Sequence, residues 1–176
     1  MITKSEQIEE RAVERIADAM CVAARTAPKA KGTDRLVTMV VNAREKDRLA
    51  DEMRRIAKDS GPAFFERDAG CLDRSAAVVL LGQRVQPMGV APCGFCGYAD
   101  CAACVQGTGM CAISTGDLGI AIGSAVSTAA QHHVDNRVMF SVGKAALNID
   151  LFDDDVKIAY GIPLSISGKS PFFDRG

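Results

Sequence analysis

Residues 93–111 read CGFCGYADCAACVQGTGMC, and this stretch places five of the seven cysteines of the chain within 19 positions. Thiolates are soft ligands that suit iron–sulfur clusters and zinc. A Cys-x-x-Cys step, as at Cys93 and Cys96, lets two sulfurs reach one metal ion or one edge of a cluster. The stretch is rich in Gly and shows little hydrophobic periodicity, so it predicts a long metal-binding loop.

Three metal groups compete for these cysteines. A [4Fe–4S] cluster needs four thiolates, and we favour Cys93, Cys96, Cys101 and Cys111. The spacing Cys96-x4-Cys101-x2-Cys104 also matches the first part of the plant-type [2Fe–2S] pattern, which requires a distant fourth cysteine that the chain lacks after Cys111. A structural zinc ion could use Cys93, Cys96, Cys101 and Cys104 in tetrahedral geometry.

The other residues of the stretch support a ligand role for its cysteines. Gly94 and Gly97 favour positive φ angles and leave room for backbone N–H groups to point at cluster sulfurs. An odd number of cysteines argues against a disulfide framework. Cys21 lies on a predicted helix among Ala and Val, and for both Cys21 and Cys71 we expect simple packing.

The totals describe one globular domain spanning residues 1–176. Hydrophobic residues make up 48% and charged residues 24% of the 176, with a formal net charge of −1. A balanced charge gives no reason to expect a nucleic-acid partner or an anionic membrane surface. No secretory segment and no apolar run of about 20 residues is visible, so we expect a cytoplasmic protein without membrane spans.

Hydrophobic periodicity predicts the elements that precede the cysteines. Residues 5–26 follow a helical pattern, and Ser5 can cap that helix. Leu36–Val41 is apolar and partly β-branched, which is typical of a strand. A second helix is expected from Asn42 to about Lys58.

In the rest of the chain, apolar runs are separated by residues such as Gly and Pro that end helices and strands. Phe64–Arg74 has no clear assignment. The expected elements are a strand at Ala76–Leu81, a loop at 82–115, a helix at Asp117–His132, a helix at 136–148 and a strand at Val156–Ile162 ended by Pro163. This order predicts an α+β fold in which helices flank a small sheet, with the loop at 82–115 inserted in a single domain.

These residues resemble known families. The pattern CGxCGxxxC followed by Cys111 resembles small [4Fe–4S] modules of corrinoid iron–sulfur proteins and electron-transfer subunits, and there the ligands correspond to Cys93, Cys96, Cys101 and Cys111. The whole chain resembles the uncharacterised ferredoxin-domain proteins of anaerobic bacteria and archaea. The matching stretches are Cys93–Cys111, Asp117–Val126, Val134–Arg137, Gly161–Leu164 and Gly168–Arg175.

A second resemblance is to the flavin-dependent nitroreductases. It rests on Ala23–Pro28 followed by Gly32 and a strand, and on Gly161-Ile162-Pro163 near the end of the chain. It implies a nitroreductase-like three-layer fold and a homodimer with FMN at the subunit interface. Only Met1–Lys4 stands where those enzymes carry the arginine-rich segment that binds the FMN phosphate.

Cationic residues near glycines are the candidates for binding a flavin phosphate or another anion. The alternative is that these side chains are ordinary surface charges in contact with water and bind no ligand. The candidate cofactor-binding residues are Lys29, Lys31, Gly32, Thr33, Lys169 and Arg175.

The sequence therefore predicts a [4Fe–4S] electron-transfer protein with an unidentified redox partner. If FMN binds as well, the protein becomes an iron–sulfur flavoprotein reductase, in which the flavin handles two-electron chemistry. The alternative is a non-redox protein whose loop is held by structural zinc or by a cluster and serves partner binding.

Overall fold

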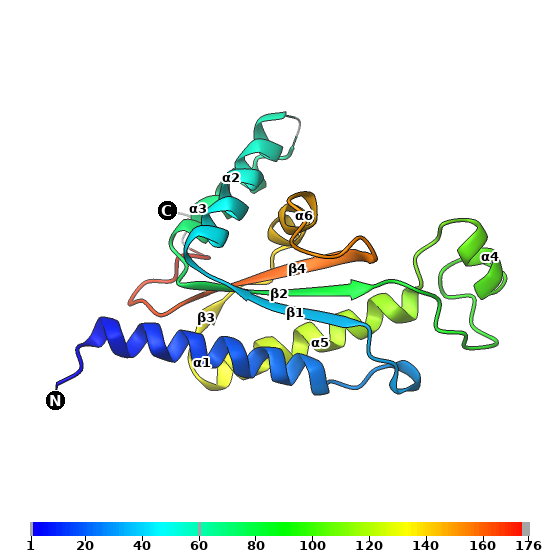
Figure 1. Cartoon of the computed structure of the whole chain (residues 1–176), viewed down its shortest axis with the longest axis horizontal. Helices are drawn as coiled ribbons and strands as arrows, with labels where there is room; N and C mark the ends of the chain where they lie inside the picture. The colour runs from blue at the N-terminus through cyan, green and yellow to red at the C-terminus, as the bar shows by residue number, and fades with distance from the viewer. Residues whose placement is uncertain (1, 60, 174–176) are drawn as a thin grey trace.

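The fold is known from a computed structural model, which describes residues 2–59 and 61–173. Figure 1 shows a small sheet between two groups of helices, with one lobe projecting from the end of the sheet. The helices and strands are α1 (Ser5–Thr26), η1 (Ala30–Gly32), β1 (Leu36–Val41), α2 (Ala43–Asp59), α3 (Phe64–Asp73), β2 (Ala77–Arg84), α4 (Cys101–Gln106), α5 (Ala112–Gln131), β3 (Asp135–Asn136), α6 (Phe140–Asn148) and β4 (Val156–Ser165).

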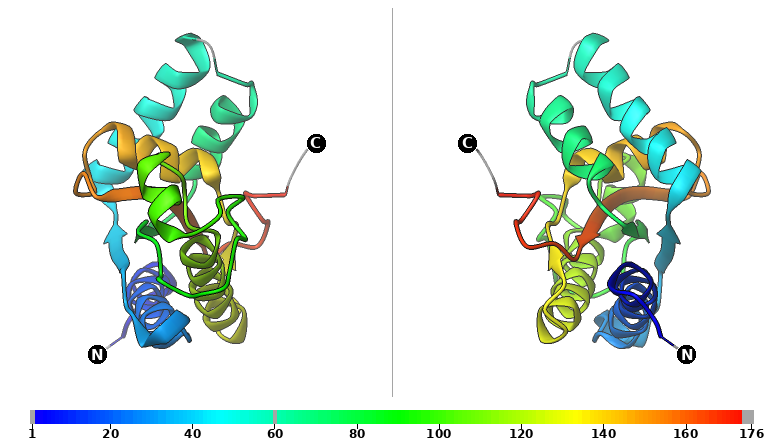
Figure 2. Two further views of the ribbon diagram at one scale, coloured as in Figure 1. Left: turned by 90° about the vertical axis from the view of Figure 1, so that its right-hand side faces the viewer. Right: turned by 90° about the vertical axis from the view of Figure 1, so that its left-hand side faces the viewer.

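The sheet has four antiparallel strands in the order β1-β2-β4-β3. The central strand β2 pairs with β1 from Leu36↔Gln83 to Val41↔Val78, and with β4 from Ala77↔Leu164 to Arg84↔Val156. Helices α1 and α5 lie side by side on one face, and α2, α3 and α6 cover the other (Figures 1 and 2). This three-layer α+β arrangement agrees with the expected fold class.

Two hydrophobic cores sandwich the sheet because residues of β2 alternate between its faces. Val78 and Leu80 join the core beneath α2, α3 and α6, whereas Val79 and Leu81 join the core against α1 and α5. All four side chains are fully buried. A strand covered on both faces reads as a continuous apolar run, which is why the sequence identified it.

The structure corrects several boundaries. Helix α1 is capped by Lys4 without a side-chain hydrogen bond, so Ser5 is its first helical residue and not its cap. Phe64–Asp73, which had no assignment, is helix α3, and it buries Phe65 and Leu72. Helix α5 begins five residues earlier than expected, at Ala112.

The last strand does not end at Pro163, which pairs with Val78 inside β4. Gly161 exchanges hydrogen bonds with Met139 on the side of β4 opposite β2. The nitrogen of Pro163, two residues further on, faces that same side, where strand pairing is interrupted. The missing N–H of proline therefore costs little there.

Helix α6 approaches β4 closely enough to require a glycine. A Cβ atom at Gly143 would lie 1.9 Å from the carbonyl oxygen of Ala159, and one at Gly161 would lie 2.2 Å from a methyl carbon of Val142. Both partners belong to packed elements, so neither contact can be relieved by a flexible side chain.

We expect Gly143→Ala to lower the free energy of unfolding by about 2 kcal/mol, because overpacking outweighs the better helix propensity of alanine. The matched control is Gly123→Ala in α5, where a Cβ meets nothing within 4 Å. Urea unfolding of both variants checks this, and equal stabilities for the two would contradict the close approach of α6 to β4.

A buried carboxylate joins α2 to α6. Glu52 accepts hydrogen bonds from Arg55 Nε at 2.7 Å and Nη2 at 2.8 Å, and from Asn148 Nδ2 at 2.7 Å. The hydrogen bonds from Arg55 are the main cause of a lowered pKa for Glu52. A lowered pKa in the folded state stabilises the fold above the unfolded pKa of about 4.3, and this stability is lost as the pH falls through the folded value.

Glu52→Gln should therefore lower the free energy of unfolding by about 1 kcal/mol at pH 7, and the difference should shrink below pH ~4. Urea titrations at neutral and acid pH measure this. Glu45→Gln is the control, since Glu45 forms an exposed pair with Arg48 at 2.6 Å. A Glu52 effect that is the same at both pH values would show that the carboxylate charge is not what stabilises the contact.

Among the residues that the structure describes, no helix combines the length and the apolar character needed to cross a membrane.

Candidate metal centre in the cysteine lobe

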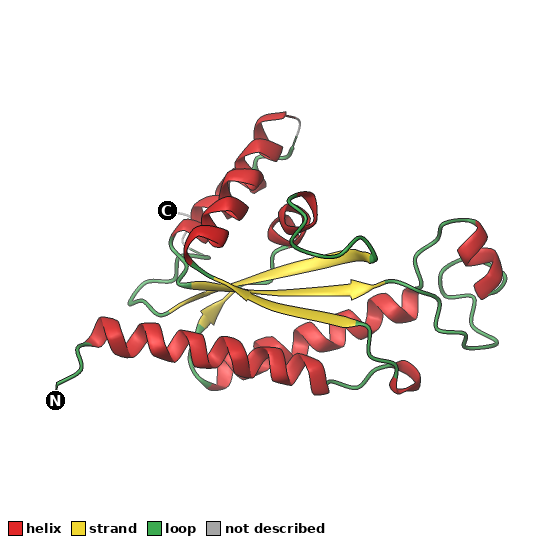
Figure 3. Cartoon of the chain, viewed as in Figure 1, coloured by secondary structure: helices red, strands yellow, loops and turns green. Residues whose placement is uncertain are grey.

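The segment between β2 and α5 forms the projecting lobe, which we call the cysteine lobe and define as residues 85–111. It is mostly irregular, and its one helix is the short α4 (Figure 3). The observed lobe lies within the loop predicted at 82–115, but β2 continues to Arg84 and α5 starts at Ala112.

Two hydrogen bonds, the first of them buried and the second exposed, hold the base of the lobe. Gln83 near the end of β2 donates from Nε2 to Ser114 Oγ in α5 at 3.1 Å, and both side chains are buried. Arg35 donates to the carbonyl oxygen of Gln86 at 2.5 Å. An unpaired buried amide or hydroxyl would cost about 1–3 kcal/mol, so these contacts fix where the lobe leaves and rejoins the fold.

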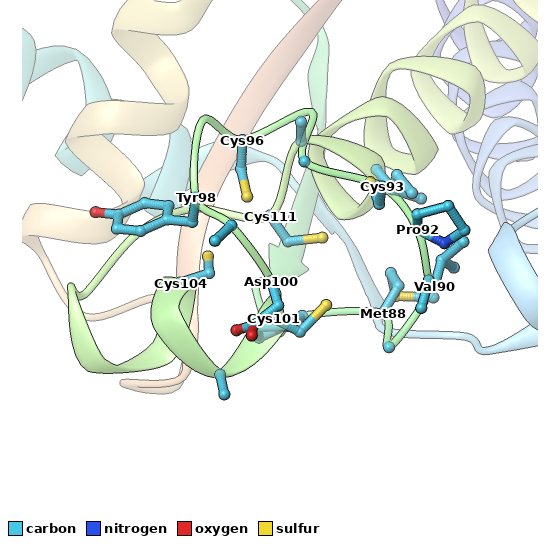
Figure 4. Close-up of a pocket in the computed structure, with 18 residues that line it drawn as sticks. Met88, Val90, Pro92, Cys93, Cys96, Tyr98, Asp100, Cys101, Cys104 and Cys111 are labelled. Atoms are coloured by element: carbon cyan, nitrogen blue, oxygen red, sulfur yellow. The ribbon is translucent and has the colours of Figure 1, made fainter.

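All five cysteines of the lobe line one cavity of about 290 Å³. Cys93 and Cys96 come from the loop, Cys101 and Cys104 from α4, and Cys111 from the residue that precedes α5. Figure 4 shows the sulfurs of Cys96 and Cys104 directed toward each other, whereas those of Cys101 and Cys111 point away from that pair, toward the side of the cavity where Met88 and Cys93 lie. The prediction that the chain brings these cysteines together is consistent with this arrangement.

The thiols differ in exposure, and the pKa of the Cys104 thiol is raised. Cys104 and Cys111 are buried, whereas Cys93, Cys96 and Cys101 are half-buried. Burial raises the pKa of the Cys104 thiol, and its hydrogen bond with Cys96 raises it further. A metal ligand must be a thiolate, so metal binding at Cys104 would have to displace a tightly held proton.

Local backbone features shape the lobe around the thiols. Gly94 and Gly97 have φ angles of 70° and 82°, as the sequence indicated. Asp100 caps α4 by accepting a hydrogen bond from the backbone N–H of Ala103 at 2.8 Å. These turns direct successive cysteines toward the cavity.

The ring of Tyr98 packs against the turn that contains Gly107 and Gly109. The Tyr98 hydroxyl donates to the carbonyl oxygen of Gly107 at 3.1 Å. A Cβ at Gly109 would lie 2.3 Å from the Tyr98 ring and 3.1 Å from Cys104 Sγ. Only glycine therefore lets the ring lie against this turn beside the buried thiol.

Gly109→Ala should displace the Tyr98 ring and expose Cys104. In the reduced, metal-free protein we expect Cys104 to be alkylated several-fold faster, measured by mass spectrometry of the modified peptides. Gly116→Ala is the control, because a Cβ there meets nothing within 4 Å. Unchanged reactivity of Cys104 in the Gly109 variant would contradict this role of the ring.

The cavity suits some metal groups better than others. In the described part of the chain, no group of three or more His, Cys, Asp or Glu side chains is placed to hold a single metal ion. Tetrahedral zinc would need its sulfurs about 3.8 Å apart, since each Zn–S bond is about 2.3 Å. A cluster binds one thiolate at each iron and spreads its ligands over a wider volume, and five soft donors around one cavity fit that demand.

The remaining two cysteines lie outside the cavity. Cys21 is half-buried on α1, and Cys71 is buried in α3, where its thiol donates to the carbonyl oxygen of Pro171 at 3.3 Å. Burial raises the pKa of both thiols. Their positions agree with the expected packing role.

The candidate anion-binding residues are not brought together within one chain. Lys29 donates from Nζ to the carbonyl oxygens of Ala24, Arg25 and Ala27 at the end of α1, which uses all three of its protons. Lys31 has a φ of 56°, and Gly32 and Thr33 follow it in the turn. This turn and the C-terminal segment lie at opposite ends of the molecule (Figure 1).

Lys169 instead lines a separate cavity of about 300 Å³ with Arg74, Ser167, Ser170 and Pro171. Arg74 is held there by its hydrogen bond to the carbonyl oxygen of Pro171 at 3.0 Å. The prediction for Arg175 lies outside the described residues.

Sequence reasoning missed the residues that support the site. Gln83 and Ser114 carry no motif, although a glutamine at the end of an apolar strand is a signal of a buried polar contact. Asp117, which is buried in α5, accepts from the backbone N–H of Ala30 at 3.1 Å and so ties the Lys29–Thr33 turn to the base of the lobe.

Comparison with known proteins identifies a family and a relative that covers most of the chain. Residues 107–175 match the family described as "Uncharacterized protein containing a ferredoxin domain (DUF2148)". A protein of Archaeoglobus fulgidus, itself described as uncharacterized, is 38% identical over 164 residues, which cover 89% of this chain and 88% of that protein.

Solved structures share the fold. An oxidoreductase containing FMN has a TM-score of 0.61 at 11% identity, and the match covers 89% of this chain and 68% of that one. A nitroreductase with bound FMN from Desulfitobacterium hafniense has a TM-score of 0.59 at 13% identity, with 96% and 81% covered. The fold is therefore nitroreductase-like, as the resemblance implied.

Proposed function

The chain belongs to the family of uncharacterized proteins that contain a ferredoxin domain, and from this premise we propose that it is an iron–sulfur electron-transfer protein. Its [4Fe–4S] cluster is bound by Cys93, Cys96, Cys101 and Cys111. The observation that carries this proposal is the convergence of five thiols on one cavity in a lobe built around them.

The cavity favours a cluster over the alternatives. Thiolates are the usual ligands of iron–sulfur clusters, whereas a zinc ion bound by Cys93, Cys96, Cys101 and Cys104 would have only four residues between its two cysteine pairs, fewer than most zinc ribbons use. Cys104 is the extra thiol in this assignment, because the pattern CGxCGxxxC followed by a later cysteine takes its four ligands from Cys93, Cys96, Cys101 and Cys111. A [2Fe–2S] cluster on Cys96, Cys101 and Cys104 would need a fourth thiolate, and the distant cysteine of the plant-type pattern does not follow Cys111, so it is the less favoured form of the same function.

A bound cluster supplies one-electron transfer, and the chain controls the surroundings in which that happens. Burial of Cys104 and Cys111 excludes water from the inner side of the cavity. The outer side, formed by Cys93, Cys96 and Cys101, stays near the surface. Burial and hydrogen bonds to the sulfurs are the properties through which proteins adjust cluster potentials.

Iron, sulfide and zinc analysis of protein purified without oxygen tests this function. We expect about four irons per chain and a brown chromophore, with both largely lost in Cys96→Ser and retained in Cys21→Ser. Two irons per chain would favour the [2Fe–2S] form. One zinc without iron would overturn electron transfer and support a structural zinc loop.

The choice of fourth ligand has its own test. Cys111→Ser should lose most of its iron, whereas Cys104→Ser should retain about as much as the wild type. Both positions are buried, so general destabilisation affects the two variants alike. Loss of iron only in the Cys104 variant would transfer the ligand role to Cys104.

The nitroreductase-like fold favours a second candidate function, an iron–sulfur flavoprotein reductase with FMN. Within one chain the turn at 29–33 and the C-terminal segment lie at opposite ends of the molecule (Figure 1), so a homodimer would have to combine turns and tails from different copies. Yellow flavin released on acid denaturation, from a species that sediments as a dimer, would support this function. A flavin-free protein that retains its iron supports the electron-transfer function alone.

A further inference from the structure

The cysteine lobe is almost free of charged side chains. Between Arg84 and Asp117, Asp100 is the only Asp, Glu, Lys or Arg residue, although charged residues make up 24% of the chain. The carboxylate of Asp100 caps helix α4. The side chains of this lobe therefore offer almost no charge that could pair with a charged group of a partner.

The same lobe exposes large apolar side chains. The exposed fractions are 79% for Phe95, 62% for Val105 and 47% for Met110. Each is the direct sequence neighbour of a cysteine that lines the cavity, namely Cys96, Cys104 and Cys111. Each of the three therefore lies close to the cavity, and exposed apolar residues next to a functional group are typical of a contact surface.

We propose that the surface of the cysteine lobe around Phe95, Val105 and Met110 docks an electron-carrier protein whose own contact face is apolar and uncharged. This inference rests on the proposed electron-transfer function, since it is the half-buried thiols at this surface that would bring a redox centre close to a partner. A charged contact face is disfavoured because its charges would lose water without gaining an ionic partner.

The charge pattern also determines how association responds to salt and to substitution. Oppositely charged faces steer association and make the rate fall with ionic strength. An apolar face lacks that dependence, and a new charge of either sign on it slows association. A bound cluster adds the same negative charge in every variant, so comparison between variants isolates the side chain.

The test measures electron transfer from the reduced, iron-loaded protein to a small blue-copper protein with an apolar docking face, followed by stopped flow. Val105 is replaced by Glu and, separately, by Lys. The matched controls are Val22→Glu and Val22→Lys on α1, because Val22 is 63% exposed and also lies on a helix. Iron content and the visible spectrum are recorded first for every variant.

We expect both Val105 variants to lower the second-order rate constant by about tenfold and both Val22 variants to stay within about twofold of the wild type. The ratio of each Val105 rate to the wild-type rate should change by less than about twofold between low and ~0.3 M salt, because the charge of the cluster is common to all of these proteins. A rate that rises with one charge and falls with the other would overturn the proposal in favour of electrostatic docking. Equal effects at Val105 and Val22 would also overturn it.

Two further outcomes separate this inference from its premise. A wild-type protein that binds no iron overturns both the electron-transfer function and the docking surface. If the iron-loaded protein self-associates and Val105→Glu alone abolishes that in sedimentation, the occupant of the surface is a second copy of the chain and the carrier proposal fails.

Discussion

The cysteine lobe depends on one buried polar contact, the hydrogen bond from Gln83 to Ser114. Gln83 belongs to the central strand and Ser114 to the first turn of α5, so this bond joins the two ends of the lobe. Both side chains are inaccessible to water, and separating them would leave two unpaired polar groups. The fixed ends turn residues 85–111 into a closed loop, whose entropy is already reduced before any ligand binds.

The layers of the fold could be predicted because buried apolar residues recur along the sequence with the period of a helix or a strand. Residues 5–26 and Leu36–Val41 were identified at their observed bounds. Phe64–Asp73 escaped because the helix is short and carries Asp68 and Gly70 in its middle. The prediction that Pro163 ends the last strand was wrong. Whether a proline interrupts a strand depends on whether its nitrogen faces a paired neighbour, and a single sequence does not show strand order.

The site was predictable in composition but not in detail. Thiol spacing placed the cysteines in one loop, since ligands of one group must be close, and glycine content indicated the positive φ angles of Gly94 and Gly97. The sequence could not show which distant residues each side chain contacts. Lys29 was a candidate anion ligand, but its amino group binds the last carbonyls of α1, a use of lysine that leaves no motif.

The lobe has almost no hydrophobic core of its own. Among residues 85–111 only Met88 and Cys104 are buried, with Cys111 at the boundary with α5. Burial of three such side chains offsets only a small part of the conformational entropy of ordering a segment of this length. Ligand binding that requires the folded arrangement adds its free energy to folding. A bound group would therefore add to the order that the fixed ends and the Tyr98 contact already give the lobe, which makes the cysteines structural and functional residues at once.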